Sequence, residues 1–262
     1  MTGFDAVGDT GVVGDDPGIF VKICGVTTEA DALLAVGMGA SAVGFIFAPS
    51  PRQMAPAAVA DIVKRLPHET VTVGVFRDEA PQRVIEIANT IGLRAVQLHG
   101  VESIEDTRWV ASRAGWTIKA FPAGHRNIDR FKEYGAEFLL IDGNNPGSGE
   151  LFDWRLAEGV LDPRRLIVSG GLRPENVGAA IEHLRPWGVD VASGVEASPG
   201  VKDPGKLREF IGAAHRAARS VAAASGTPSD AAYAGGGGVD PAGAAGGGAA
   251  GAPGPFDWQE EQ

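Results

Sequence analysis

Short apolar runs recur along the chain, and turn-forming residues bound each of them. The runs are rich in Val, Ile, Leu and Phe, which is typical of short buried strands. The predicted strands are 19–24, 42–47, 71–76, 94–98, 117–121, 137–142, 165–169 and 189–193. The predicted helices are 28–38, 56–65, 80–90, 103–113, 126–133, 154–158, 174–184 and 203–219. Prolines near several helix starts support this pattern, because the first helical turn does not need the N–H that proline lacks.

Strands and helices thus alternate eight times, which predicts an α/β fold of the (β/α)₈ type, a TIM barrel. An open, doubly wound sheet is the main alternative. Such a sheet usually has fewer units, and no Gly-x-Gly-x-x-Gly pattern follows the first strand here. In a (β/α)₈ barrel the chemistry takes place where the strands end and the loops to the helices begin. The residues at the carboxyl ends of the strands are therefore the candidates for a site.

The two ends of the chain differ in composition from its middle. The formal net charge is −10, but nine acidic residues and no basic ones lie in 1–18 and 222–262. The rest of the chain carries only −1 and has no basic stripe, which argues against nucleic-acid binding. From residue 222 onward, 23 of 41 residues are Gly or Ala, too little apolar surface to offset the entropy of ordering. We predict a flexible extension over 1–18, a single barrel domain over 19–220 and a disordered acidic tail over 221–262.

Features of targeting and of metal binding are missing from the sequence. No apolar run approaches the roughly 18 residues that a membrane helix needs, and the first residues lack the basic and apolar regions of a signal peptide. The single cysteine cannot form an internal disulfide and fits a reducing compartment. The five histidines show no metal-ligand spacing. We expect a cytoplasmic protein that binds no metal and no membrane.

Cys24 ends the first predicted strand, and alternation places Lys22 on the same side of that strand. If Val21 and Ile23 face the helices, Lys22 and Cys24 face the barrel interior. A thiol acts as a base or nucleophile only when ionised, and a nearby ammonium favours the thiolate. We therefore predict that Lys22 lowers the pKa of Cys24, and that Asp190, on the eighth strand, holds the ammonium. The alternatives are an inert buried thiol and a lysine that only completes a layer of the interior.

Polar residues also end the fourth and sixth strands, and one follows the second strand. Asp142 ends the sixth, as a candidate general acid or base or as a cap for the next turn. The loop that follows, 143–150, is rich in Gly, Asn and Ser and is predicted to act as a lid. Gln97 and His99 alternate at the end of the fourth strand and face the same side, as ligand contacts or as wall residues. Arg52 follows the second strand, where its guanidinium can hold a carboxylate or lie in solvent.

Glycine-rich turns follow the seventh and eighth strands, with Gly170 and Gly171 in one and Ser193 and Gly194 in the other. Glycine permits a close approach of the backbone to a ligand, and the serine adds a hydroxyl donor. In (β/α)₈ barrels these two loops frequently bind phosphate. A need for sharp turns would explain one such loop, but it explains two less well. We predict a phosphate site at this position.

Taken together, the motifs resemble the phosphoribosylanthranilate isomerases of tryptophan biosynthesis. The matching stretches run in order from about residue 19 to about residue 218, and they are 22–27, 44–47, 50–52, 73–76, 96–100, 140–142, 147–149, 152–154, 169–172, 174–176 and 190–196. The resemblance implies a (β/α)₈ barrel and an Amadori rearrangement. The implied substrate is N-(5-phosphoribosyl)anthranilate, and the product is 1-(2-carboxyphenylamino)-1-deoxyribulose 5-phosphate.

The resemblance also implies roles for individual residues. Cys24 would be the general base and Asp142 the general acid, while Arg52 would hold the anthranilate carboxylate. The loops after the seventh and eighth strands would hold the phosphate. A cationic iminium serves as the electron sink in this reaction, so no metal or organic cofactor is expected. The partner is the small-molecule substrate, and the chain is expected to be a monomer or a homodimer.

The sequence departs from the family pattern at Arg77-Asp78, where a small residue and Asn are common, at Ala192, where Ser is common, and in its two extra tails. The first departure leaves the role of the end of the third strand open. Two other functions also stay open. One is a phosphate-binding barrel isomerase of a related aminoaldose, a class that uses paired aspartates. The other is a non-catalytic barrel that binds a sugar phosphate.

Overall fold

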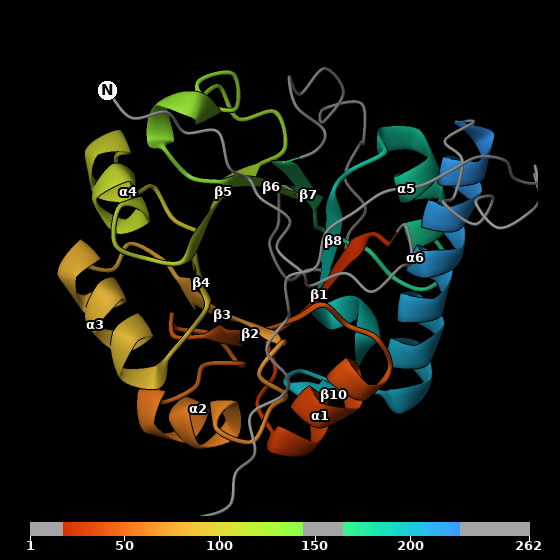
Figure 1. The fold of residues 1–262 in the computed structure, drawn as a ribbon, viewed down its shortest axis with the longest axis horizontal. Coiled ribbons are helices and arrows are strands. Elements are labelled where there is room, and N and C mark those ends of the chain that lie inside the picture. The colour runs from red at the N-terminus through yellow and green to blue at the C-terminus, as the bar shows by residue number, and fades with distance from the viewer. Residues whose placement is uncertain (1–17, 144–164, 226–262) are drawn as a thin grey trace, which may run out of the picture. The chain divides into compact units, whose positions relative to one another are not determined.

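A computed structural model of the protein describes residues 18–143 and 165–225. Eight parallel strands form a closed barrel in sequence order, and β8 pairs with β1 (Figure 1). The strands are β1 (Phe20–Cys24), β2 (Ala42–Ile46), β3 (Val71–Phe76), β4 (Ala95–Leu98), β5 (Trp116–Pro122), β6 (Phe138–Asp142), β7 (Leu166–Val168) and β8 (Gly188–Val191). The expected (β/α)₈ barrel and all eight of its strands are confirmed.

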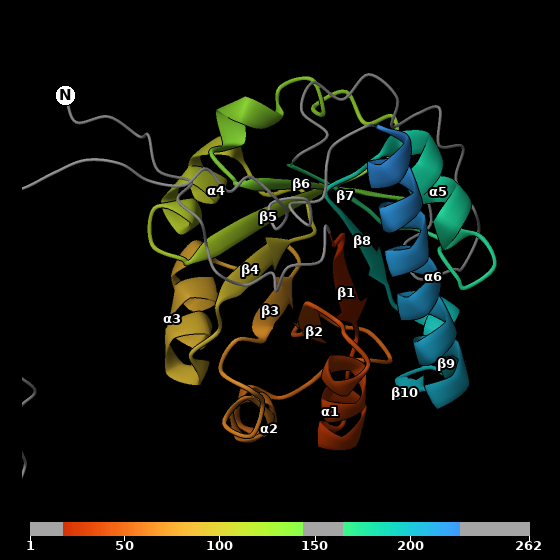
Figure 2. The same cartoon turned by 45° about the vertical axis from the view of Figure 1, so that its right-hand side comes forward.

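Helices surround the barrel, as Figures 1 and 2 show. They are α1 (Glu29–Gly37), α2 (Pro56–Val63), α3 (Pro81–Ile91), α4 (Ile104–Ala111), α5 (Val177–Leu184) and α6 (Pro204–Ala224). A side-chain oxygen of Thr28, Ser103 or Asp203 accepts a backbone N–H at the start of α1, α4 or α6, respectively. Proline occupies the first turn of α2, α3 and α6. No helix of the described ranges is long and apolar enough to cross a membrane.

The expected helix over 126–133 is wrong for most of its length. Only a short 3₁₀ helix, η1 (Phe131–Tyr134), forms there, and turns precede it. Local polar bonds stabilise those turns, since the Asn127 backbone N–H donates to His125 Nδ1 and the Asn127 side chain donates to Tyr134. Such local side-chain bonds compete with helix formation.

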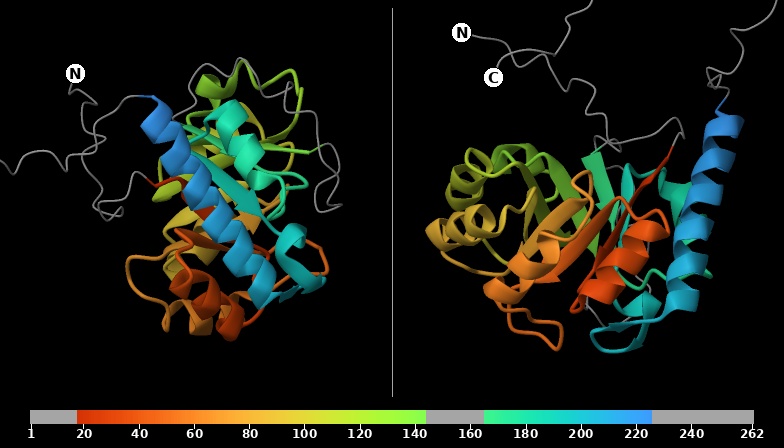
Figure 3. Two further views of the ribbon diagram at one scale, coloured as in Figure 1. Left: turned by 90° about the vertical axis from the view of Figure 1, so that its right-hand side faces the viewer. Right: turned by 60° about the horizontal axis from the view of Figure 1, so that its bottom comes forward.

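Helix α6 runs to Ala224, past the boundary expected at residue 220. Val221 packs against the apolar core, and alanine has the highest helix propensity, so the helix continues into the Ala-rich segment. Figure 3 shows α5 and α6 side by side on the outside of the barrel. The rest of the predicted tails, the predicted helix 154–158 and residues 144–150 of the predicted lid lie outside the described residues.

A small antiparallel hairpin, which the sequence pattern did not indicate, follows β8. It consists of β9 (Glu196–Ser198) and β10 (Val201–Lys202), and a short 3₁₀ helix, η4 (Ser193–Val195), precedes it. Figure 2 shows the hairpin beside the beginning of α6. The hairpin lies outside the barrel sheet, yet two of its side chains reach the carboxyl end of the barrel, as described below.

The apolar core has an inner and an outer layer. The inner cluster includes Phe20 and fills the barrel, whereas Val21 and Ile23 belong to the cluster between the strands and the helices. This alternation confirms that Lys22 and Cys24 lie on the inner face of β1. Aromatic rings close the amino end of the barrel, where Phe20 and Phe138 stack on Trp187 and Trp116 packs against all three. Polar side chains lie at the opposite, carboxyl end of the barrel.

Candidate active site

Cys24 and Asp142 lie at the carboxyl ends of β1 and β6, and therefore at the same rim of the parallel barrel. Both are almost buried, with exposed fractions of 6% and 5%. Polar groups continue around the rim between them. Ser169, after β7, donates to Asp190 Oδ2 at 3.5 Å, and Asp190 Oδ1 accepts from Lys22 Nζ at 2.9 Å. Ser169, Asp190 and Lys22 thus form one row of polar side chains that leads toward Cys24.

The ion pair of Lys22 and Asp190 follows from the strand register, because the two residues are direct partners in the pairing of β1 with β8. Both side chains are buried. Lys22 also lies close to the thiol, since a Cβ built on Gly44 would stand 3.2 Å from Lys22 Nζ and 3.0 Å from Cys24 Sγ. Only glycine leaves room for both groups at this point. The expected ion pair across the seam of β8 and β1 is confirmed.

Burial is the largest single effect on the pKa of each group, but it sets the direction of the shift only for Cys24. It lowers the pKa of the Lys22 ammonium, but the negative charges of Asp190 and of the Cys24 thiolate outweigh it, so this pKa lies above its ordinary value. Burial raises the pKa of the Cys24 thiol, and the positive charge of Lys22 opposes this effect without reversing it. Lys22 thus acts on the thiol in the expected direction, although the thiol's pKa stays above its ordinary value.

Asp142 is held on both of its oxygens. Its Oδ1 accepts the backbone N–H of Gly143 at 2.9 Å, and its Oδ2 lies 3.2 Å from His99 Nε2. The other ring nitrogen of His99, Nδ1, lies 2.8 Å from Gln97 Nε2. Because an amide nitrogen can only donate, this contact places the proton of a neutral His99 on Nε2, where it points to Asp142. Gln97 and His99 face the same side, as predicted; His99 contacts the carboxylate, and Gln97 contacts His99.

Glycines bring the loops after β6, β7 and β8 together. Gly170 and Gly171 have left-handed backbones, with φ of 87° and 69°. A Cβ on Gly170 would overlap the backbone N of Gly143, and a Cβ on Gly194 would overlap the carbonyl O of Leu172. The two loops predicted to hold phosphate therefore lie in contact, and the first of them also touches the end of β6.

Ser193 and Gly194 line a pocket of about 700 Å³, whose other lining residues are Leu172, Arg173, Glu175, Asn176 and Lys206. Gly170 and Gly171 do not line it. Two of the lining residues, Arg173 and Lys206, are basic, and neither was a candidate from the sequence. Lys206 lies in the first turn of a helix, where an exposed lysine is common. The charges of the two side chains suit an anion such as phosphate.

Arg52 lies across the end of β1. A Cβ on Gly25 would stand 2.5 Å from its Cδ, so the glycine after Cys24 makes room for this side chain. The Arg52 Nε and Nη2 atoms donate to the two carboxylate oxygens of Glu196, each at 2.7 Å. Those hydrogen bonds raise the pKa of the guanidinium. Arg52 is thus fixed at the rim, and the alternative that it lies in solvent is wrong.

Lys202 binds the same carboxylate, at the oxygen that also accepts from Arg52 Nε. Its Nζ donates to Glu196 Oε1 at 2.9 Å, to the carbonyl O of Cys24 at 2.7 Å and to that of Ala192 at 3.1 Å. Neither Glu196 nor Lys202 was a candidate from the sequence. The hairpin brings them to the barrel, and no periodicity in the chain indicated that hairpin.

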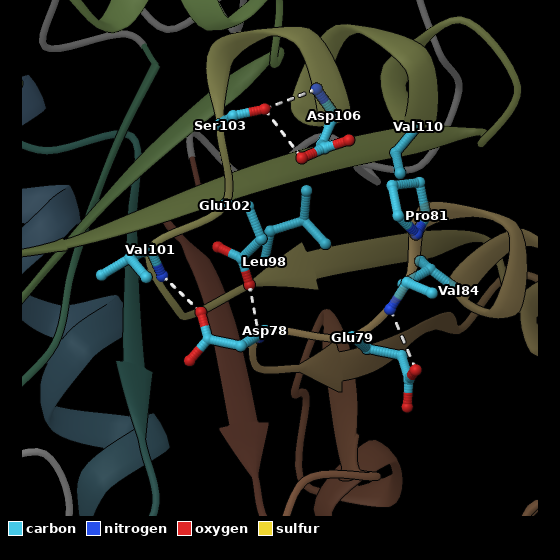
Figure 4. Close-up of a pocket in the computed structure, with 11 residues that line it drawn as sticks. Asp78, Glu79, Pro81, Val84, Leu98, Val101, Glu102, Ser103, Asp106 and Val110 are labelled. Carbon is cyan, nitrogen blue, oxygen red and sulfur yellow. Dashed lines mark hydrogen bonds between the residues drawn. The ribbon is translucent and has the colours of Figure 1, made fainter.

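The residues after β3, where the sequence departs from the family pattern, form hydrogen bonds with the loop after β4. Asp78 has a φ of 53°, and its Oδ1 accepts the backbone N–H of Val101 at 2.7 Å (Figure 4). Its own N–H donates to Glu102, which also accepts from the buried Lys119 at 2.6 Å. Asp78 and Glu102 line a pocket of about 500 Å³ that also contacts α3 and α4. Because both carboxylates are already paired, we assign this cluster to the connection between two loops.

The chain matches a family described as N-(5'-phosphoribosyl)anthranilate (PRA) isomerase over residues 21–213. The N-(5'-phosphoribosyl)anthranilate isomerase of Desulforudis audaxviator is 48% identical over 204 residues, which cover 75% of this chain and 98% of the relative.

Solved structures agree with the sequence match. A phosphoribosyl anthranilate isomerase in complex with reduced 1-(o-carboxyphenylamino)-1-deoxyribulose 5-phosphate has a TM-score of 0.67 at 42% identity, over 75% of this chain and 98% of that one. Monomers generated from the dimeric phosphoribosylanthranilate isomerase of Thermotoga maritima give a TM-score of 0.67 at 41% identity, with the same coverage.

Proposed function

Because the chain belongs to the family of N-(5'-phosphoribosyl)anthranilate isomerases, we propose that it isomerises N-(5-phosphoribosyl)anthranilate in tryptophan biosynthesis. The product of this Amadori rearrangement is 1-(2-carboxyphenylamino)-1-deoxyribulose 5-phosphate. The observation that carries the proposal is the placement of Cys24 and Asp142 at one rim, beside two touching glycine loops. One group can give a proton and the other can take one.

Asp142 is the general acid in this proposal. In its protonated form it gives a proton to the ring oxygen of the ribose, the C1–O bond breaks, and a cationic iminium forms between C1 and the anthranilate nitrogen. The backbone N–H of Gly143 and the ring of His99 fix the carboxyl group, so it delivers the proton from one position. The iminium is the electron sink for the next step, which therefore needs no cofactor.

Cys24 is the general base. Its thiolate removes the proton from C2, and the electron pair of that bond moves toward the iminium to form an enolamine. The enolamine then takes up a proton at C1, loses the proton of its C2 hydroxyl group and becomes the ketone. Lys22 lies close to the sulfur on the inner face of the barrel and favours the thiolate, while Asp190 holds the ammonium. Lys22 works against the burial that raises the pKa of the thiol, whereas the negative charge of Asp190 adds to it.

Contacts at both ends of the substrate hold the reacting carbons between these groups. The phosphate binds at the loops that contain Gly170 and Gly171 and Ser193 and Gly194. Arg52 receives the anthranilate carboxylate, and Gln97 acts through its contact with His99. Binding far from the reacting bonds positions C2 at the thiolate and supplies a large part of the rate.

Loss of substrate fluorescence tests the proposal. Wild type is expected to turn over N-(5-phosphoribosyl)anthranilate, and Cys24→Ser and Asp142→Asn are each expected to lower kcat by about 10²- to 10⁴-fold. Asp106→Asn, a change of carboxylate to amide in an exposed helix start, is the matched control and should keep full activity. Undiminished turnover by the two site variants would refute the assigned roles. No turnover by wild type would refute the function and favour a barrel that only binds a sugar phosphate.

The assembly and the location are also part of the proposal. We infer a monomer or homodimer in the cytoplasm, on the basis of the dimeric Thermotoga maritima relative and of the single cysteine, which fits a reducing compartment. Sedimentation of the purified chain at micromolar concentration measures the assembly, and a higher oligomer would contradict the inference.

A further inference from the structure

The cluster formed by Arg52, Glu196 and Lys202 contains two cations and one anion, so it carries one uncompensated positive charge. All three side chains are largely buried. Burial raises the pKa of Glu196, but hydrogen bonds from the two cations outweigh it and hold that pKa below its ordinary value. The carboxylate is therefore ionised at neutral pH. Burial lowers the pKa of the Lys202 ammonium, and Glu196 opposes this effect without reversing it. While the ammonium is protonated, the surplus charge of the cluster is positive.

The two cations differ in how much of their bonding capacity the protein uses. Lys202 has three donors and three acceptors, namely Glu196 and the carbonyl groups of Cys24 and Ala192. A guanidinium has five N–H donors, and Glu196 accepts only two of those of Arg52, on the side that contains Nε and Nη2. Among the described residues, no other acceptor binds the guanidinium. Its remaining fork, which contains Nη1 and the second N–H of Nη2, can still donate two hydrogen bonds to a carboxylate.

We propose that Glu196 is a positioning residue that orients Arg52, so that the free fork of the guanidinium faces the ring carboxylate of the substrate. The proposal rests on the proposed function and adds to it the group that aims Arg52. An arginine side chain has several rotatable bonds, and a fork-to-fork pair with a carboxylate needs a fixed plane. Glu196 fixes the plane of the guanidinium, and Gly25 makes room for the methylene groups of the Arg52 side chain.

The position of Glu196 in the chain supports this role. It directly follows η4, which contains Ser193 and Gly194 of the phosphate loops, and its own carbonyl accepts from Lys206, which lines the pocket there. Glu196 is thus attached by its backbone to the phosphate end of the site and by its side chain to Arg52. It sets the distance between the two anion-binding ends, which a substrate with a phosphate and a carboxylate has to match.

Two binding probes test the proposal without turnover. One is reduced 1-(o-carboxyphenylamino)-1-deoxyribulose 5-phosphate, and the other is the same compound without the ring carboxyl group. Their affinities for the full chain are measured by calorimetry. Wild type should bind the carboxylated compound more tightly. Glu196→Gln should weaken the carboxylated compound about tenfold, because an amide can no longer accept both donors, and should leave the other compound unchanged. In an Arg52→Met background, Glu196→Gln should have no further effect on the ratio of affinities.

A purely electrostatic role predicts the opposite sign. Removing the negative charge of Glu196 leaves the cluster more positive, and the carboxylated compound would then bind more tightly to Glu196→Gln. That result, or an equal loss for both compounds, would overturn the proposal. Glu102→Gln removes another buried glutamate that pairs with a lysine, and it is the control for a general loss of stability. The proposal is also overturned if Glu102→Gln changes the ratio as much as Glu196→Gln. If wild type binds neither compound, the proposed function fails and this inference fails with it.

Discussion

Replacing Lys22 by Met should make the Cys24 thiol harder to ionise, and replacing Asp190 by Asn should make it easier. The Lys22 Nζ and Cys24 Sγ atoms lie 3.2 and 3.0 Å from the same point, the Cβ position of Gly44. They are therefore within about 6 Å of each other, a distance at which two unit charges interact by about 3 kcal/mol at an effective dielectric constant of about 20. Since one pH unit corresponds to about 1.4 kcal/mol, Lys22→Met should raise the thiol's pKa by about two pH units.

The pH dependence of alkylation by iodoacetamide measures this pKa, because only the thiolate reacts at an appreciable rate. Cys24 is the only cysteine of the chain, so mass spectrometry follows a single site. The alkylation rate rises with pH as the thiol ionises. That rise should move to higher pH in Lys22→Met. It should move to lower pH in Asp190→Asn, because the carboxylate raises the pKa of the thiol and Lys22 is then left with only the thiolate as an anionic partner.

The opposite signs make this pair of variants informative. Each variant breaks the same buried ion pair, and either one is expected to lower the free energy of unfolding by about 3–5 kcal/mol. An effect that came only from lost stability would shift both profiles in the same direction. Equal shifts, or an unchanged profile in Lys22→Met, would refute the reasoning. Circular dichroism under the alkylation conditions checks that each variant is folded.

Further predictions concern the loops and the hairpin. Gly170→Ala should lower both kcat and stability, the latter by about 2 kcal/mol or more, because the residue needs a φ of 87° and a Cβ would overlap Gly143; an unchanged thermal midpoint would contradict this. Asp78→Ala should cost about 1–2 kcal/mol in urea unfolding, whereas Asp78→Asn, which keeps the acceptor and tolerates the left-handed backbone, should cost almost nothing. The pKa of Glu196 is depressed in the folded state, so its stabilising effect is present above its ordinary pKa of 4.5 and is lost as the pH falls through the folded value. The difference in thermal midpoint between wild type and Glu196→Gln should therefore shrink on acidification, and a difference that grows would contradict the assignment.

The barrel and the residues at its strand ends could be predicted because simple periodicities determine them. Buried parallel strands appear as short apolar runs, and alternation within a strand assigns each side chain to one face. Alternation and strand order predict that Lys22, Cys24 and Asp190 lie close together, as they do in the structure. Alternation also places Gln97 and His99 on one side of β4, and the structure adds that His99 contacts Asp142.

Other parts of the site depend on contacts that no local pattern encodes. The two strands of the hairpin, β9 and β10, contain only three and two residues and no apolar run, yet the hairpin brings Glu196 and Lys202 to the rim. The pKa of Cys24 also escaped prediction, because its direction depends on how deeply the fold buries the thiol compared with the effect of one ammonium. The predicted helix near residue 126 failed because side-chain bonds to nearby groups stabilise turns in its place.

The stack of Phe20, Trp116, Phe138 and Trp187 at the amino end of the barrel has a consequence for substrate entry and product release. Among the described residues, these rings and the apolar inner cluster fill the amino half of the barrel, so no passage runs along its axis past Cys24. Under the proposed function, substrate therefore enters and product leaves at the same carboxyl rim. Product is then expected to inhibit competitively with respect to substrate.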